Sequence, residues 1–206
     1  MVRYTGPKNR IARKFSVNIF NRAKNPLLHK SNPPGMHGAK RKKKSDYGNQ
    51  LLEKQKLKAA YGMLSDKQLL ISYNRAIKQK GDKTETLLTI LECRLDNIVY
   101  RLRFAPTIFA AHQLVSHGHI KVDGKKIDIR SFSVKPGMVI SIKEKSKKIK
   151  HILASIGNTA REIPEYLSLN EDKTSGSLIS LPTAEQIPLP LVINVHLVCE
   201  FLSHTH

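Results

Sequence analysis

The chain has 206 residues, 40% of them hydrophobic, and a formal net charge of +20. That length suffices for one large domain or two small ones with a buried core, and that charge indicates a polyanionic partner. A membrane partner would require about eighteen successive apolar residues, a basic amphipathic helix with a broad apolar face, or a lipidation site, and the sequence contains none of these. We therefore expect no membrane and favour nucleic acid as the partner.

The charge is distributed unevenly along the chain. Residues 1–45 contain thirteen Lys or Arg and no Asp or Glu, residues 46–150 contain twenty-one against ten, and residues 151–206 contain two against six. The first three quarters of the chain should therefore meet the polyanion.

Residues 1–45 are interrupted by Gly6-Pro7, Asn25-Pro26 and Pro33-Pro34-Gly35, which predicts an extended arm. Cations alternate there with aromatic and aliphatic residues, so the arm could place cations on phosphates while a ring packs on a base. A disordered basic tail is the alternative. The candidate contacts in this arm are Arg3, Tyr4, Lys8, Arg10 and Arg13.

Five successive cations follow at the end of the arm. A run of like charges does not pack against its own protein core, so it is either solvated or bound to nucleic acid. We favour binding, because the aromatic-containing arm lies beside it in the sequence. The run consists of Lys40, Arg41, Lys42, Lys43 and Lys44.

Residues 46–93 are expected to form a helical subdomain of about three helices. Ser45 can cap a helix that runs to about Tyr61, and a clearer cap follows, because Ser65 and Gln68 have the capping-box spacing. That second helix should bury the stripe Leu69, Leu70, Tyr73 and Ile77, and Thr84 should open the third. In the first helix we expect Lys54, Lys56 and Lys58 to lie largely outside.

Residues 94–143 carry the most readable pattern in the chain. Leu95, Ile98, Val99 and Leu102 have the spacing of one helical stripe. Pro106 ends that segment, Thr107 can cap a second helix, and Gly118 suits its C-terminal end.

After Gly118 the apolar period changes from 3.6 to 2, which predicts strands. Ile120 and Val122 alternate with polar residues, Asp123-Gly124 is a tight-hairpin signal, and Pro136-Gly137 predicts another turn before a strand through Ile140. Two short helices should therefore lead into a small twisted sheet. Its polar edge supplies the remaining candidate contacts, which are Arg94, Gln113, Ser116, His117, His119, Lys121, Lys125 and Lys126.

The last quarter of the chain is less basic. The run from Lys143 to Lys150 continues the basic edge, and residues 157–186 indicate loops with one strand from Leu178 to Leu181. Pro188 and Pro190 prevent a helix there, and the apolar residues from Ile193 to Phe201 predict a short buried helix.

The sequence contains no recognisable catalytic or metal site. His117 and His119 lack a third ligand, and no carboxylate near Ser116 or His117 in the sequence could orient a catalytic ring. Cys93 and Cys199 are far apart on apolar segments, which is typical of buried reduced thiols. We expect no catalytic residue, no cofactor and no metal.

The motifs RLDNIVYRL, QLVSHGHIKVDGKKI and VKPGMVISIKEKS resemble the RNA-binding module of the S4 family of small-subunit ribosomal proteins. The stretches MVRYTGPKNR, PPGMHGAKRKKKSDYGNQLLEKQKLKAAYGML and GDKTETLLTILECRLDNIVYRL extend this resemblance to the bacterial-type family from end to end. RNA-modifying enzymes that use the same module lack such an N-terminal half. A pseudouridine synthase and a stress-response RNA chaperone are the rival hypotheses.

The resemblance implies an α+β fold in which the C-terminal tail completes the helical subdomain and the RNA-binding module is an insertion. The expected division is 1–45 as the arm, 46–93 as the helical subdomain, 94–157 as the module and 158–206 as the tail that packs on the helical subdomain.

Two departures from the family pattern stand out. Residues 8–22 lack the cysteines that form a zinc site in many members, and residues 107–112 read TIFAAH where members usually have Thr-Arg-Ala-Glu-Ala-Arg. The second departure weakens the carry-over of the family's RNA contacts to Ile108 and Phe109, and an exposed Ile108 or Phe109 could instead serve a protein neighbour.

As to function, the resemblance implies a non-enzymatic component of the small ribosomal subunit in the cytoplasm, bacterial rather than plastid-encoded. Such a protein binds the five-prime domain of small-subunit ribosomal RNA early, nucleates assembly and influences decoding accuracy. The implied further partners are small-subunit proteins three and five and its own messenger RNA.

Overall fold

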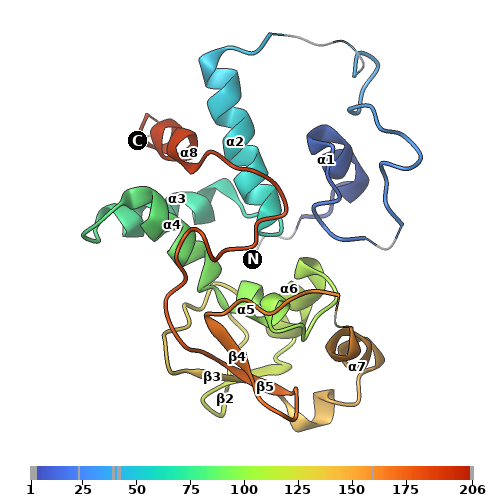
Figure 1. Ribbon diagram of the computed structural model, residues 1–206, viewed down its shortest axis with the longest axis vertical. Coiled ribbons are helices and arrows are strands. Elements are labelled where there is room, and N and C mark those ends of the chain that lie inside the picture. The colour runs from blue at the N-terminus through green and yellow to red at the C-terminus, as the bar shows by residue number, and fades with distance from the viewer. Residues whose placement is uncertain (1–3, 23, 39, 41–42, 159, 205–206) are drawn as a thin grey trace. The chain divides into compact units, whose positions relative to one another are not determined.

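The computed structural model describes residues 4–22, 24–38, 40, 43–158 and 160–204. The chain divides into two compact units (Figure 1). The first unit combines the two ends of the sequence, Met1–Leu87 and Leu189–His206, and the second is the continuous segment Leu88–Pro188. The fold class is α+β, which confirms the prediction, and a segment from the C-terminus completes the helical unit.

Helices build the described part of the first unit, and the last turns of α4 continue into the second. They are α1 (Lys8–Phe15), α2 (Asp46–Ala60), α3 (Asp66–Ile77), α4 (Lys83–Glu92) and α8 (Val195–Ser203).

Side-chain caps define where most of these helices begin. The Ser45 hydroxyl accepts from the backbone N–H of Gly48, and Ser65 accepts from that of Gln68, which confirms both predicted caps. The third helix begins one residue earlier than predicted, because Asp82 rather than Thr84 accepts the first free N–H groups. Asn194 caps α8 in the same way.

Helix α8 packs along α2 and buries Val198 and Phe201. The Glu53 carboxylate of α2 accepts a hydrogen bond from the Asn194 backbone N–H (2.8 Å), and the Lys54 ammonium lies 4.2 Å from the centre of the Phe201 ring. Segments 141 residues apart in sequence are thus held at the start of α8 by a charge-assisted hydrogen bond.

The prediction that the lysines of α2 lie largely outside is wrong. Lys58 is only 7% exposed, and its ammonium binds Asp66 at 2.7 Å, while Lys56 binds Glu53 at 2.6 Å. Lysine stems can cover apolar surface while the charged end finds a partner, a possibility that helical spacing alone does not reveal. Similarly, Ile77 of the predicted stripe is exposed at the end of α3.

The N-terminal arm is not extended throughout, because α1 forms within it. Pro7 immediately precedes the first turn, where its missing N–H costs nothing, and Ala12 is buried. The Arg13 guanidinium donates to the carbonyl of Asn32 (3.0 Å), and the Arg22 guanidinium donates to the Asn9 side chain (2.7 Å). The arm therefore folds back on itself locally.

The second unit is a small sheet with helices. Its helices are α5 (Leu95–Arg101), α6 (Ile108–Ser116), the 3-10 turn η1 (Glu144–Ser146) and α7 (Lys150–Gly157). Its strands are β1 (Ile120–Val122), β2 (Lys125–Lys126), β3 (Val139–Ile142), β4 (Leu167–Leu169) and β5 (Ser175–Leu178). The strand order is β2-β1-β3-β5-β4, and every pairing is antiparallel.

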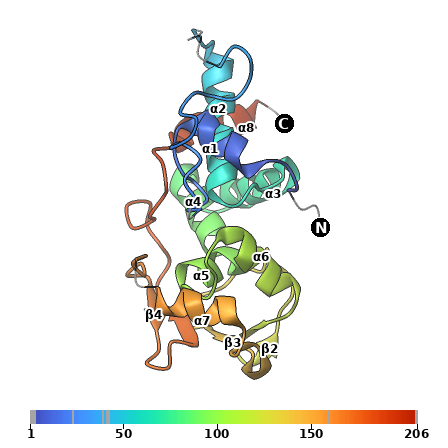
Figure 2. The ribbon, with the colours of Figure 1, turned by 90° about the vertical axis from the view of Figure 1, so that its right-hand side faces the viewer.

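Helices α5 and α6 lie on one face of this sheet (Figures 1 and 2). The predicted stripe of α5 is fully buried and meets Ile120 and Ile140 of the strands in one apolar core. Thr107 caps α6 as predicted. Asp123 and Gly124 both have positive φ, at 47° and 77°, which is the geometry of a two-residue hairpin turn.

Three elements of the second unit were not predicted correctly. Helix α7 was not predicted: the sequence indicated only that the run from Lys143 to Lys150 continues the basic edge, whereas a helix begins at Lys150 and its Ile152 is fully buried in the core. The predicted strand at 178–181 shares only Leu178 with the observed strand β5, which covers Ser175–Leu178 and pairs with β3. A second strand, β4, pairs with β5 and was not predicted. Residues 158–188, expected to pack on the helical subdomain, thus lie in the compact unit of the sheet.

A buried charge network links the end of α4 to the rest of the second unit. The Glu92 carboxylate, fully buried, accepts hydrogen bonds from the Arg101 guanidinium (2.6 Å) and the Tyr166 hydroxyl (2.7 Å). Burial, followed by the neighbouring Glu92 charge, raises the pKa of Tyr166, so its hydroxyl remains a donor.

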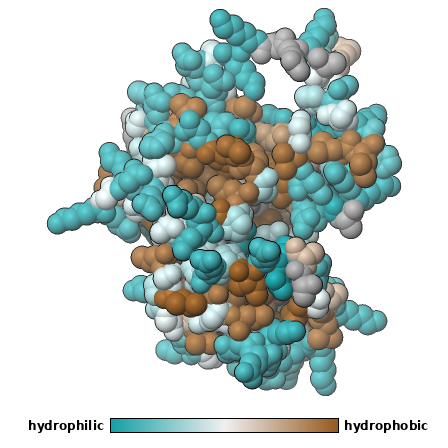
Figure 3. Space-filling model, in the orientation of Figure 1, coloured by the Kyte–Doolittle hydropathy of each residue, from teal (hydrophilic) through white to brown (hydrophobic). Residues whose placement is uncertain are grey.

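Hydrophilic side chains cover much of the face shown in Figure 3, with apolar residues visible between them. None of the described helices has both the length and the apolar character that a bilayer crossing requires.

Candidate nucleic-acid interface

Most of the candidate residues of the second unit gather where α6 leads into β1 and the β1–β2 hairpin. Gln113, Ser116 and His117 are exposed at the end of α6, and Lys125 and Lys126 are exposed on β2. Lys121 on β1 is half-buried and pairs in register with Lys126. The side chain of Lys126 lies over Gly118 so closely that a Cβ there would collide with it.

His119 connects this edge to the segment before α7. Its Nδ1 is 2.8 Å from the Ser146 hydroxyl, and its ring centre lies 6.0 Å from that of His117. Burial, with further contributions from His117 and Lys143, lowers the pKa of His119. At neutral pH this side chain is therefore a neutral hydrogen-bonding ring and adds no positive charge.

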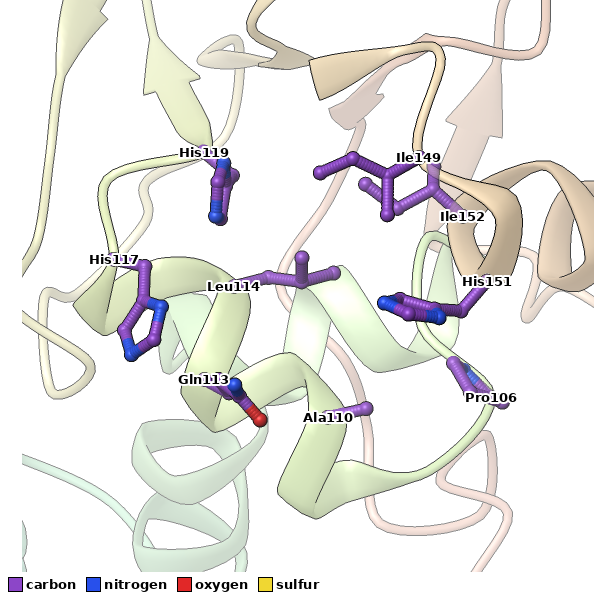
Figure 4. Close-up of a pocket in the computed structure, with 9 residues that line it drawn as sticks. All are labelled: Pro106, Ala110, Gln113, Leu114, His117, His119, Ile149, His151 and Ile152. Atoms are coloured by element: carbon purple, nitrogen blue, oxygen red, sulfur yellow. The ribbon is translucent and has the colours of Figure 1, made fainter.

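A hollow of about 100 Å³ opens between α6 and α7, beside this edge (Figure 4). Its apolar lining includes Leu114, Ile149 and Ile152, and its polar lining residues are Gln113, His117, His119 and His151. None of the described residues that line it is an Asp or Glu. The lysines of the 143–150 run lie along the same segment, where Lys148 and Lys150 are exposed.

The candidate RNA contacts of the first unit are spread over a longer stretch of the chain. Lys40, Lys43 and Lys44 are exposed, as a phosphate-binding run must be, whereas Arg41 and Lys42 of that run, like Arg3, lie outside the described residues. Arg10 is exposed on α1, while Tyr4, Lys8 and Arg13 are half-buried.

Comparison with known proteins identifies the chain. The family model for the ribosomal protein S4/S9 N-terminal domain matches residues 3–92, and that for the S4 domain matches residues 93–140. The protein named small ribosomal subunit protein uS4 from Protochlamydia amoebophila is 62% identical over 205 residues, which cover 100% of both chains. The chain belongs to the uS4 family.

Other uS4 relatives show the same full-length match. Those of Chlamydia trachomatis serovar D and Chlamydia caviae are 58% and 55% identical, each over 207 residues that cover 99% of both chains. The family resemblance noted in the sequence is thereby confirmed, and the chain is a uS4 member without the zinc-binding cysteines.

One candidate contact of this uS4 chain does not lie on its surface. Arg94 is 7% exposed and forms a two-pronged pair with Asp96, at 3.1 Å from Nε and 2.8 Å from an amino nitrogen. Asp96 also lies 3.3 Å from His112 Nε2. Arg94 therefore stabilises the start of α5 and is not available to a nucleic acid.

The residues at the departure from the uS4 pattern are also less accessible than expected. Ile108 is 5% exposed and faces the interior, and the half-buried Phe109 ring packs edge-on against His112 at 5.9 Å. These apolar replacements therefore extend the packing around α6, and Ile108 presents no exposed apolar surface for a protein neighbour.

The candidate contacts predicted from the sequence omit residues around α7 that lie beside this edge. Lys148 and Lys150 were not among them, although both belong to the run of cations from Lys143, and neither was His151. Only the fold shows that His151 lines the same hollow as His117 and His119.

No described group of three or more His, Cys, Asp or Glu side chains is arranged to hold a metal ion. The His119 ring lies within hydrogen-bonding distance of the Ser146 hydroxyl and near the His117 ring. No Asp or Glu takes part in the interactions described for these two histidines. The described groups at this site can donate hydrogen bonds, stack and attract anions.

Proposed function

We propose that this chain is a non-enzymatic structural component of the small subunit of a bacterial-type cytoplasmic ribosome and binds small-subunit ribosomal RNA. The observation that carries the proposal is the 62% identity, along its whole length, to a protein named as a small ribosomal subunit protein. The exposed cations on the described surface of both units support it.

Three separate basic elements would hold the RNA. They are the arm with α1, the run that begins at Lys40, and the edge formed by the end of α6, the β1–β2 hairpin and the segment before α7. Their cations supply affinity through contacts with phosphates. Specificity would come mainly from RNA shape, because the major groove of an A-form helix is too narrow for side chains to read.

The more specific role that we propose is early binding to the five-prime domain of the RNA, which would nucleate assembly of the subunit. Small-subunit proteins three and five would be neighbours, decoding accuracy would depend on these contacts, and the chain would also bind its own messenger. A surface for protein neighbours has support in the charge distribution, since residues 151–206 carry two cations against six acids. Such a surface is poorly suited to RNA.

A salt series tests the proposal. Purified protein is titrated with the five-prime domain RNA and with an unrelated folded RNA of equal length at increasing salt. We expect about a thousandfold preference for the five-prime domain and a steep salt dependence, with on the order of six to ten counterions released. Equal affinity for both RNAs would contradict the proposal and favour a general RNA chaperone.

A further inference from the structure

The hollow between α6 and α7 combines an apolar floor with a polar rim. Leu114, Ile149 and Ile152 form the floor, and Gln113 and His119 lie among the rim residues (Figure 4). His119 is fixed through Nδ1 by Ser146, whose side chain is itself buried, so its Nε2 is left for a ligand. The hollow is thus shaped by packed elements of one unit.

Its chemistry fits a flat heterocycle with polar edges. Aliphatic and imidazole surfaces can pack on the faces of such a ring, and every nucleobase has a face of this kind. The Gln113 amide offers both a donor and an acceptor, and the His119 ring offers one or the other according to its tautomer. An apolar protein side chain would contact the floor but would form no hydrogen bonds with Gln113 or His119.

The surroundings of the hollow favour a ligand that carries a phosphate. Helix α7 starts beside it at Lys150 and has neither an acidic residue in its first turn nor a side-chain cap. Lys148 and Lys150 are exposed there. The positive end of a helix dipole together with neighbouring cations attracts anions, so the same nucleotide could place its phosphate here.

We propose that this hollow captures one unpaired base of the bound RNA, with the adjacent phosphate at the start of α7. This inference rests on the proposed function and adds to it a specific pocket for a single nucleotide. Base capture would contribute shape specificity that phosphate contacts alone do not provide.

The test fills the hollow without changing any charge. In the variant Ala110→Phe, a bulky ring replaces the methyl group of a half-buried residue that lines the hollow. Ala154→Phe is the matched control, because Ala154 is exposed on α7 and does not line the hollow. Circular dichroism establishes that both variants fold.

Both variants and the unmodified chain are titrated with the five-prime domain RNA across a salt series, and unpaired bases in each complex are probed with base-specific methylating reagents. We expect Ala110→Phe to bind about five- to a hundredfold more weakly, as for the loss of one stacked base. The salt slope should stay unchanged, since no phosphate contact is removed. One base, protected by the unmodified chain and by Ala154→Phe, should become reactive.

Equal affinity and equal protection for the two variants would overturn base capture while leaving the proposed function intact. Base capture is also overturned if Ala110→Phe binds RNA normally but the complex no longer accepts later small-subunit proteins, because the hollow would then hold a protein side chain. If the unmodified chain itself shows no preference for this RNA, the proposed function fails, and the inference fails with it.

Discussion

Among the charged side chains of this protein, those that are buried and paired should be the most sensitive to substitution. Glu92 is the strongest example, because its carboxylate is fully buried and serves both the Arg101 guanidinium and the Tyr166 hydroxyl. Replacing both members of a buried ion pair with apolar residues can leave stability almost unchanged. Removing only one member lowers stability strongly, because the remaining charge is buried without a partner.

We therefore expect Glu92→Ala to lower the free energy of unfolding by about 3–5 kcal/mol, measured by urea denaturation. Tyr166→Phe, which removes one hydrogen bond from the same carboxylate, should cost only about 1 kcal/mol. Exposed Glu162→Ala is the control and should change little. A loss below about 1 kcal/mol for Glu92→Ala would show that the network contributes little to stability.

The two thiols should react at different rates. Burial, and next the Glu92 charge, raise the pKa of Cys93 to about 12, and burial also raises the pKa of the half-buried Cys199. Because the thiolate is the reactive form, native Cys93 should be alkylated at least about a hundredfold more slowly than in urea at about pH 8, and Cys199 at an intermediate rate.

Mass spectrometry of iodoacetamide-treated samples over time distinguishes the two sites. Alkylation of native Cys93 at the rate of the unfolded chain would contradict the burial of this thiol. Both cysteines should react alike in urea, which is the internal control.

At the scale of elements, close packing of backbone against backbone limits which residues β5 accepts. A Cβ on Gly176 would lie 2.5 Å from the Ser168 carbonyl oxygen of β4 and 2.7 Å from a Leu102 methyl group of the segment after α5. Neither the paired strand nor the buried leucine can move aside easily.

Gly176→Ala should therefore destabilise the protein by about 1–3 kcal/mol, as measured by urea denaturation. Gly157→Ala at the end of α7 is the matched control, because a Cβ there meets no atom within 4 Å. The control should be neutral or slightly stabilising, since alanine loses less backbone entropy in a helix. If the two variants were equally stable, the strand contact would not be as close as described.

For the whole molecule, the dominant property is charge, and its effect should appear in the salt dependence of RNA binding. Replacing residues 40–44 with alanine should weaken binding to all RNAs and lower the salt slope by roughly four, since each phosphate contact contributes a little under one. Circular dichroism should be unchanged, because the described lysines of this run are exposed.

The control removes the same number of cations elsewhere on the described surface. It replaces Lys67, Lys78, Lys80, Lys83 and Lys173, none of which is a candidate contact. An equal fall in slope for both variants would mean that net charge alone governs binding, and an unaltered slope for the 40–44 variant would remove this run from the interface.

The sequence by itself determined the local structure wherever short-range signals agree. The capping residues Ser45, Ser65 and Thr107 and the Asp123-Gly124 turn act within three or four residues of the chain, so their spacing is sufficient. The spacing of apolar residues also predicted the buried stripe of α5 correctly. The family resemblance rested on several sequence motifs that occur in the same order as in the family.

Only the tertiary structure decided which polar residues are buried and which distant segments meet. Arg94 and Lys58 have the sequence pattern of surface cations, yet each pairs with a carboxylate and is buried. The carboxylates, Asp96 and Asp66, are near them in the sequence, but only the packing of the surrounding elements shows that these pairs are removed from solvent. Strand β4 and the hollow that joins His151 to His117 likewise depend on long-range pairing and packing. Such contacts are set by the free energy of the whole core, which no local pattern encodes.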